Sequence, residues 1–208
     1  MIAIIDYGAG NLRSVVNAIA HLGYEMKLTN KPDDVLAARA VILPGVGAGG
    51  DTVASLNKLG LADVICRVIA EDKPFLGICI GLQVLFTYTE EGGRHDCLNA
   101  IPGKVQKLPA VLKVPHMGWN QVRQLRPHPV FDGIPDLSNF YFVHSYHAVP
   151  DDKSVIAGET EYGITFCSVV ARGNLVATQF HPEKSGVMGL KFYDNFLKNV
   201  LRKSKQGI

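Results

Sequence analysis

Residues 75–86 read FLGICIGLQVLF and place a cysteine, Cys79, between two glycines where an apolar run changes its period. The apolar residues up to position 78 are typical of a buried strand, and residues 80–88 have the spacing of a helix. Gly77 and Gly81 lack a Cβ and therefore permit a sharp, crowded turn around Cys79. The stretch predicts a strand, a tight turn and a helix, with Cys79 at the carboxyl end of the strand.

Short apolar strands alternate with helical patterns throughout the first half of the chain. This alternation predicts a parallel sheet with helices on both faces. From about residue 103 the pattern changes to strands and turns, and residues 187–201 form a last amphipathic helical pattern. We therefore expect one domain over residues 1–208. Its fold class is α/β, with an open, mostly parallel central sheet flanked by helices and additional antiparallel strands in the C-terminal half.

Composition limits the classes of function. The chain has 208 residues, of which 47% are hydrophobic, and this is enough for a sizeable core. Its 21 Lys and Arg barely exceed its 19 Asp and Glu, so we expect no nucleic-acid partner. No apolar run approaches the roughly 20 residues that span a bilayer, and the first residues do not resemble a leader. We expect a cytoplasmic protein that does not bind membranes.

The four cysteines have no spacing that suits zinc or a set of disulfides, so we expect neither a metal nor a cofactor. Cys66 and Cys167 lie in apolar runs and are interpreted as small buried hydrophobic residues. Cys97 lies in a polar loop. Cys79 is different, because ligands gather at the carboxyl ends of parallel strands.

Cys79 is a candidate nucleophile. A GxCxG turn is typical of a nucleophile elbow, and the N–H groups of a following helix would favour the thiolate. The alternative is a small buried cysteine in a turn that tolerates glycine.

His181 is the candidate base among seven histidines, because it ends an apolar strand and is followed by Pro182 and Glu183. In an extended segment, residues i and i+2 project to the same side, so Glu183 is expected to orient the imidazole. The alternative is a surface turn that contains HPE by chance.

The stretch LPGVG at residues 43–47 follows another predicted strand. Its glycines free backbone N–H groups, so the N–H groups of Val46, Gly47 and Ile80 are candidates for an oxyanion hole. Taken alone, PGVG is also compatible with an ordinary tight loop.

Together, GICIGLQ, a later HPE and the upstream PGVG resemble the triad-type (class I) glutamine amidotransferases, whose fold is flavodoxin-like. Within that superfamily, DYGAGNLRSV, PGVGA, PHMGWN, YFVHSY and QFHPEKS resemble the family of glutaminase subunits of imidazole glycerol phosphate synthase. The resemblance covers nearly the whole chain. The combination of LPGVGAGG with GICIGLQ does not fit the anthranilate synthase or vitamin B6 glutaminases.

The resemblance implies that Cys79 attacks the side-chain amide of L-glutamine, with His181 as acid and base and Glu183 as its orienting group. It implies a heterodimer with a (β/α)₈-barrel cyclase, which uses the ammonia to make imidazole glycerol phosphate and AICAR in histidine biosynthesis. The implied glutamine contacts are Gln83, His144, Ser145 and Tyr146. The implied contacts with the cyclase are Asn11, Trp119, Tyr141 and Lys184.

Three alternatives remain. A paralogous glutaminase could supply ammonia to another synthase, such as one in surface-sugar biosynthesis. GAGNLR resembles a dinucleotide-binding turn, but Arg13 occupies the position of the third glycine. A non-catalytic regulatory module would be expected to lack a member of the triad, whereas Cys79, His181 and Glu183 are all present.

Overall fold

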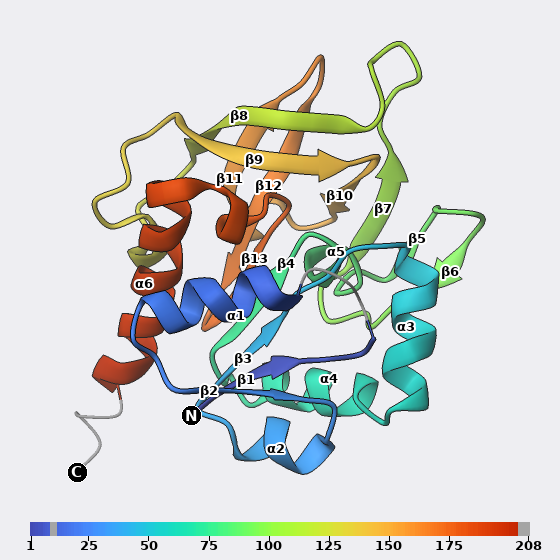
Figure 1. Ribbon diagram of the computed structural model, residues 1–208. Coiled ribbons are helices and arrows are strands. Elements are labelled where there is room, and N and C mark those ends of the chain that lie inside the picture. The colour runs from blue at the N-terminus through green and yellow to red at the C-terminus, as the bar shows by residue number, and fades with distance from the viewer. Residues whose placement is uncertain (9–11, 204–208) are drawn as a thin grey trace.

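The computed structural model describes residues 1–8 and 12–203. Five parallel strands form the centre of its sheet, and the order across the sheet is β2, β1, β3, β4 and β13. The strands are β1 (Ile2–Ile5), β2 (Met26–Thr29), β3 (Ala40–Leu43), β4 (Phe75–Ile78) and β13 (Leu175–Thr178). The expected parallel sheet is confirmed, and its last strand comes from near the end of the chain (Figure 1).

Helices cover both faces of this parallel sheet (Figure 1). In β1, Ile2 and Ile4 pack toward one hydrophobic cluster, whereas Ala3 and Ile5 pack toward the other, because side chains alternate along a strand. The first cluster includes residues of α1 (Leu12–His21) and α6 (Gly186–Lys203). The second includes residues of α2 (Pro32–Ala37), α3 (Gly49–Lys58) and α4 (Ala62–Ala70).

Antiparallel strands extend the sheet beyond β13, as expected for the second half of the chain. β12 pairs with β13, and β10 and β7 follow, while β11 links β12 to the long pair formed by β8 and β9. The bounds are β5 (Tyr88–Thr89), β6 (His95–Asp96), β7 (Gly103–Lys107), β8 (His116–Gln124), β9 (Ser138–His144), β10 (Tyr146–Pro150), β11 (Ile156–Glu161) and β12 (Thr165–Arg172). Three 3₁₀ helices are η1 (Pro129–Phe131), η2 (Lys153–Val155) and η3 (Pro182–Lys184).

The expected helix over residues 80–88 is wrong in its length, because α5 (Ile80–Gln83) is a single turn. The carbonyl groups of the next three residues accept hydrogen bonds from a distant loop instead of continuing the helix. The donors are the backbone N–H groups of Leu98, Asn99 and Ile101. The dipole of so short a helix is small, so the expected support of a thiolate by a helix does not hold.

No helix in the described part of the chain combines the length and apolar character that a membrane crossing requires.

Candidate active site

The ends of β4 and β13 bring two distant segments together. These strands are parallel neighbours, and Ile78 pairs in register with Thr178. Cys79 follows Ile78 directly, and its backbone N–H donates to the carbonyl oxygen of Thr178 at 2.7 Å. His181 comes three residues after Thr178. The sheet therefore delivers the cysteine and the histidine to the same edge.

Cys79 has the strained backbone of an elbow. Its φ of 54° and ψ of −103° lie in a region that residues with a Cβ rarely adopt. A Cβ on Gly77 would collide with the carbonyl oxygen of Gly81, and a Cβ on Gly81 would collide with the carbonyl oxygen of Leu43. The two glycines are therefore needed because backbone from the neighbouring turn and from β3 crowds the elbow.

His181 and Glu183 form a buried pair. Nδ1 of His181 lies 2.8 Å from Oε1 of Glu183, and both side chains are 1% exposed. The expectation that an extended segment aligns them is wrong, because residues 182–184 form the 3₁₀ turn η3. The hydroxyl of Tyr193 donates to Oε2 of Glu183 at 3.3 Å. Two elements therefore position the carboxylate: the segment after β13, through His181, and helix α6, through Tyr193.

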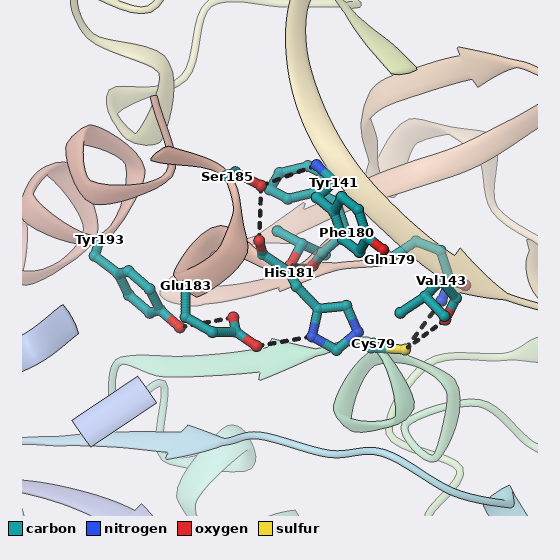
Figure 2. A network of polar contacts seen from close by, with 10 residues as sticks. Cys79, Tyr141, Val143, Gln179, Phe180, His181, Glu183, Ser185 and Tyr193 are labelled. Carbon is teal, nitrogen blue, oxygen red and sulfur yellow. Dashed lines mark hydrogen bonds and ion pairs between the residues drawn. The ribbon is translucent and has the colours of Figure 1, made fainter. Parts of the chain in front are cut away.

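The other ring nitrogen of His181, Nε2, faces the sulfur of Cys79 (Figure 2). Among the described residues, no nitrogen or oxygen atom forms a hydrogen bond with Nε2. Burial lowers the pKa of His181, but the hydrogen bonds and charges of Cys79 and Glu183 outweigh it and raise the pKa to about 10. The geometry therefore favours an imidazolium beside the sulfur.

Cys79, His181 and the predicted glutamine contacts line one pocket of about 250 Å³. Gln83, His144, Ser145 and Tyr146 all contribute to its wall. Both hydrogens of the Gln83 amide go to protein acceptors, so Oε1 is the atom left for a ligand. The remaining lining residues are Val46, Gly47, Ile80, Glu91, Pro115 and Val143.

The three residues expected to form the oxyanion hole also line this pocket. Ile80 is the first residue of α5, where a backbone N–H has no acceptor within the helix. Gly47 has a φ of 107°, which only glycine adopts without strain. All three residues therefore lie around the pocket in which the sequence analysis expects an oxyanion hole.

Glu91 was missed by the sequence analysis. It is acidic, it lines the pocket, and its Oε2 accepts a hydrogen bond from the backbone N–H of Gly49 at 2.9 Å. It follows β5 in a polar loop that carries no recognisable motif, so no local signal identifies it.

The pairing of His144, which lines the pocket, with the buried His116 was also missed by the sequence analysis. Nδ1 of His116 lies 2.9 Å from Nε2 of His144, and Nδ1 of His144 lies 2.8 Å from the carbonyl oxygen of Tyr146. A carbonyl only accepts, so Nδ1 of His144 carries a proton and Nε2 accepts from His116. Burial lowers the pKa of His116 to about 4 and that of His144 to about 3. Both rings are therefore neutral near pH 7.

Three of the four residues expected at a partner interface lie together. The rings of Trp119 and Tyr141 meet edge to face at 6.1 Å, and the Lys184 ammonium lies 5.9 Å from the Tyr141 ring. Trp119 is 57% exposed, so it is not a core aromatic residue. Asn11 lies outside the described residues.

Within the described ranges, no three His, Cys, Asp or Glu side chains are arranged to hold a metal ion.

Comparison with known proteins agrees with this geometry. Residues 3–200 match the family model of Glutamine amidotransferase class-I. The chain is 56% identical over 205 residues to "Imidazole glycerol phosphate synthase subunit HisH" of Dehalococcoides mccartyi, which covers 99% of this chain and 100% of that protein. It is 53% identical over 195 residues to the protein of the same name from Moorella thermoacetica, covering 94% and 93% of the two chains.

Solved structures share the fold. PurLQS from Thermotoga maritima matches with a TM-score of 0.73 at 17% identity, covering 98% of each chain. A glutamine amidotransferase crystal structure matches with a TM-score of 0.72 at 18% identity, covering 96% of this chain and 99% of the other. These likenesses confirm the expected fold class, and the family match with the two close relatives identifies the family: the chain belongs to the class-I glutamine amidotransferases.

Proposed function

We propose that this chain is the glutaminase subunit of an imidazole glycerol phosphate synthase and works as a single domain over residues 1–208. Relatives that are 56% and 53% identical over nearly the whole chain carry the name of that subunit, which supports this assignment. The alternative of a paralogue that serves surface-sugar biosynthesis is not favoured by these relatives. The observation that supports the chemistry best is the strained Cys79 elbow beside the buried His181–Glu183 pair.

The first half-reaction forms a thioester. The Cys79 thiolate attacks the side-chain carbonyl carbon of L-glutamine, and the carbonyl oxygen becomes an oxyanion. The backbone N–H groups of Val46, Gly47 and Ile80 stabilise this charge. Nε2 of the His181 imidazolium gives its proton to the leaving nitrogen, the carbon–nitrogen bond breaks, and ammonia departs.

The second half-reaction restores the enzyme. Nε2 of His181 is now neutral and takes a proton from a water molecule, which attacks the thioester carbon. The carbon–sulfur bond breaks, glutamate leaves, and the sulfur returns as a thiolate beside the imidazolium. Glu183 accepts the hydrogen bond from Nδ1 throughout, which keeps Nε2 directed at the reacting atoms.

Substrate orientation follows from the charges around the pocket. Glutamine carries an α-ammonium group, and Glu91 is the acidic residue that lines the pocket. A carboxylate there pairs with the ammonium and directs the amide of the substrate toward Cys79. Oε1 of Gln83 accepts a further hydrogen bond from the substrate.

The ammonia acceptor lies on another protein in this proposal. Free ammonia is protonated in bulk water and loses its nucleophilicity, so an enclosed path to the acceptor is required. We assign this acceptor site to a (β/α)₈-barrel cyclase that makes imidazole glycerol phosphate and AICAR. The exposed cluster of Trp119, Tyr141 and Lys184 supports a contact surface for that subunit, because aromatic groups are enriched at protein interfaces.

The described cysteines are free thiols, as a reducing cytoplasm would keep them, and we assign the activity to that compartment.

Glutamate release tests the proposed function. The chain is mixed with the barrel cyclase of the same organism, loaded with the cyclase substrate, and supplied with glutamine. We expect glutamate from the wild-type chain, none from Cys79→Ala, and wild-type rates from the matched control Cys97→Ala. Equal release by Cys79→Ala would reject the mechanism, and release that does not respond to the cyclase would reject the proposed partner.

A further inference from the structure

Gln179 is a buried amide beside the nucleophile for which the mechanism above has no task. It follows β13 directly, is 0% exposed, and donates its backbone N–H to the carbonyl oxygen of Ser168 at 2.9 Å. Its side-chain Nε2 lies 3.7 Å from the sulfur of Cys79 and donates to it. Figure 2 shows the His181 ring on one side of the sulfur, with Gln179 and Val143 on the other.

The orientation of this amide is fixed by two further groups. The carbonyl oxygen of Tyr146 only accepts, and Nε2 of Gln83 donates to it at 2.9 Å. The second hydrogen on the same nitrogen goes to Oε1 of Gln179 at 3.1 Å. Rotating the Gln179 amide would bring two donors face to face. Tyr146 therefore orients Gln83, which orients Gln179, and an N–H of Gln179 is left facing the sulfur.

The sulfur contacts two groups that favour opposite protonation states of Cys79. The carbonyl oxygen of Val143, 3.9 Å away, accepts a hydrogen bond from the thiol and favours the protonated form. The N–H of Gln179 donates to the sulfur, and such a bond strengthens when the acceptor becomes an anion. Without the N–H of Gln179, the hydrogen bond to the Val143 carbonyl would favour the thiol over the thiolate more strongly.

We propose that Gln179 is a catalytic residue of the glutaminase reaction. Its side-chain N–H stabilises the Cys79 thiolate before attack and again when glutamate leaves, and it holds the sulfur in position opposite His181. The inference rests on the proposed function, since it assigns a task within that reaction.

The pH dependence of alkylation at Cys79 tests this inference without glutamine. The chain is treated with iodoacetamide over a range of pH, and peptide mass spectrometry follows the label on Cys79. In Gln179→Met, which has similar volume and no N–H, we expect the pH of half-maximal alkylation to rise by about one unit. Below the half-maximal pH of the wild type the rate falls by up to about tenfold, whereas the plateau at high pH does not fall.

Gln124→Met is the matched control. The side-chain amide of Gln124 donates a hydrogen bond within the protein, to the carbonyl oxygen of Ile134, and Gln124 does not line the pocket. This variant should follow the wild-type profile. If Gln179→Met fails to fold, Gln179→Glu retains an acceptor for Gln83 and places an acid beside the sulfur, and its profile must also move to higher pH. An unchanged profile in a folded Gln179 variant would overturn the inference.

A kinetic measurement separates this inference from the proposed function. In the complex with the cyclase, Gln179→Met should lower kcat for glutamate release by about tenfold and leave KM for glutamine within about twofold. A wild-type complex without glutamate release would reject the proposed function. A normal kcat for Gln179→Met in an active wild-type background would reject the role of Gln179 alone.

Discussion

Nδ1 of His181 and Oε1 of Glu183 lie 2.8 Å apart, and both side chains are 1% exposed. A neutral imidazole has one ring proton, and a carboxylate at Nδ1 keeps that proton away from Nε2. Nε2 is then free to take a proton from an attacking water molecule. The pair therefore determines which ring nitrogen faces Cys79 during the second half-reaction.

Replacing the carboxylate by an amide should disable this arrangement. In Glu183→Gln, an amide N–H can face Nδ1 and favour the wrong tautomer, so we expect kcat to fall by about a hundredfold or more. Tyr193→Phe removes only one hydrogen bond to the same carboxylate and should lower kcat by no more than about fivefold. Steady-state glutamate release in the complex measures both. Equal activity of Glu183→Gln and wild type would exclude an orienting role for the carboxylate.

The paired histidines predict a loss of stability in acid. In the unfolded chain, His116 and His144 bind protons below about pH 6.5, whereas the folded chain resists protonation until about pH 4 and pH 3. Between pH 6.5 and 4.5 the unfolded state therefore binds more protons, and the free energy of unfolding falls by about 1 to 2 kcal/mol for each histidine.

Urea unfolding at several pH values measures this loss. His116 donates to His144 through Nδ1, and its Nε2 accepts from Nδ2 of Asn120 at 3.2 Å. In His116→Gln, the amide can make both kinds of hydrogen bond but does not titrate. Its stability should fall less steeply between pH 6.5 and 4.5 than that of the wild type. Parallel curves would show that His116 does not contribute to the acid sensitivity.

The crowding at the elbow predicts a selective effect of glycine substitutions. Gly81→Ala places a methyl group against the carbonyl oxygen of Leu43, which is backbone and cannot move aside. We expect a loss of about 3 kcal/mol in the free energy of unfolding. Gly50→Ala, in helix α3, meets only the side chain of the exposed His95 and should change stability by less than about 1 kcal/mol. Similar thermal unfolding of the two variants would contradict the described elbow.

The exposed aromatic cluster predicts a defect in partner binding. Trp119→Ala should weaken the affinity for the cyclase by about tenfold or more, because exposed tryptophans are frequent hot spots. Leu28→Ala, which truncates an exposed apolar residue on the edge strand β2, should leave the affinity unchanged. Calorimetric titration of each variant with the cyclase distinguishes these results. An unaltered affinity of Trp119→Ala for the cyclase would show that the interface lies elsewhere on the chain.

The parts of the site that sequence could predict were those with local signals. The glycines around Cys79 indicate a tight turn, and HPE places an acid near a histidine at a strand's end. The predicted length of the helix after Cys79 was wrong, because hydrogen bonds from residues 98–101 end α5. No local pattern in the sequence encodes that contact.

Residues that depend on strand register were missed for the same reason. His116 faces His144 only because β8 and β9 pair in that register. Gln179 meets the sulfur because β13 lies beside β4, although 100 residues separate Gln179 from Cys79. Neither pairing is visible in the spacing of the sequence.

A glutamine analogue with an electrophilic carbon in place of the side-chain amide tests the central claim most directly. Burial raises the pKa of Cys97 to about 11 and that of Cys167 to about 12, and it also raises the pKa of Cys66, so these thiols should react slowly. Peptide mapping by mass spectrometry should find one label, on Cys79, and excess glutamine should prevent it. A label on another residue, with no protection by glutamine, would contradict the assignment of Cys79 as the nucleophile of this pocket.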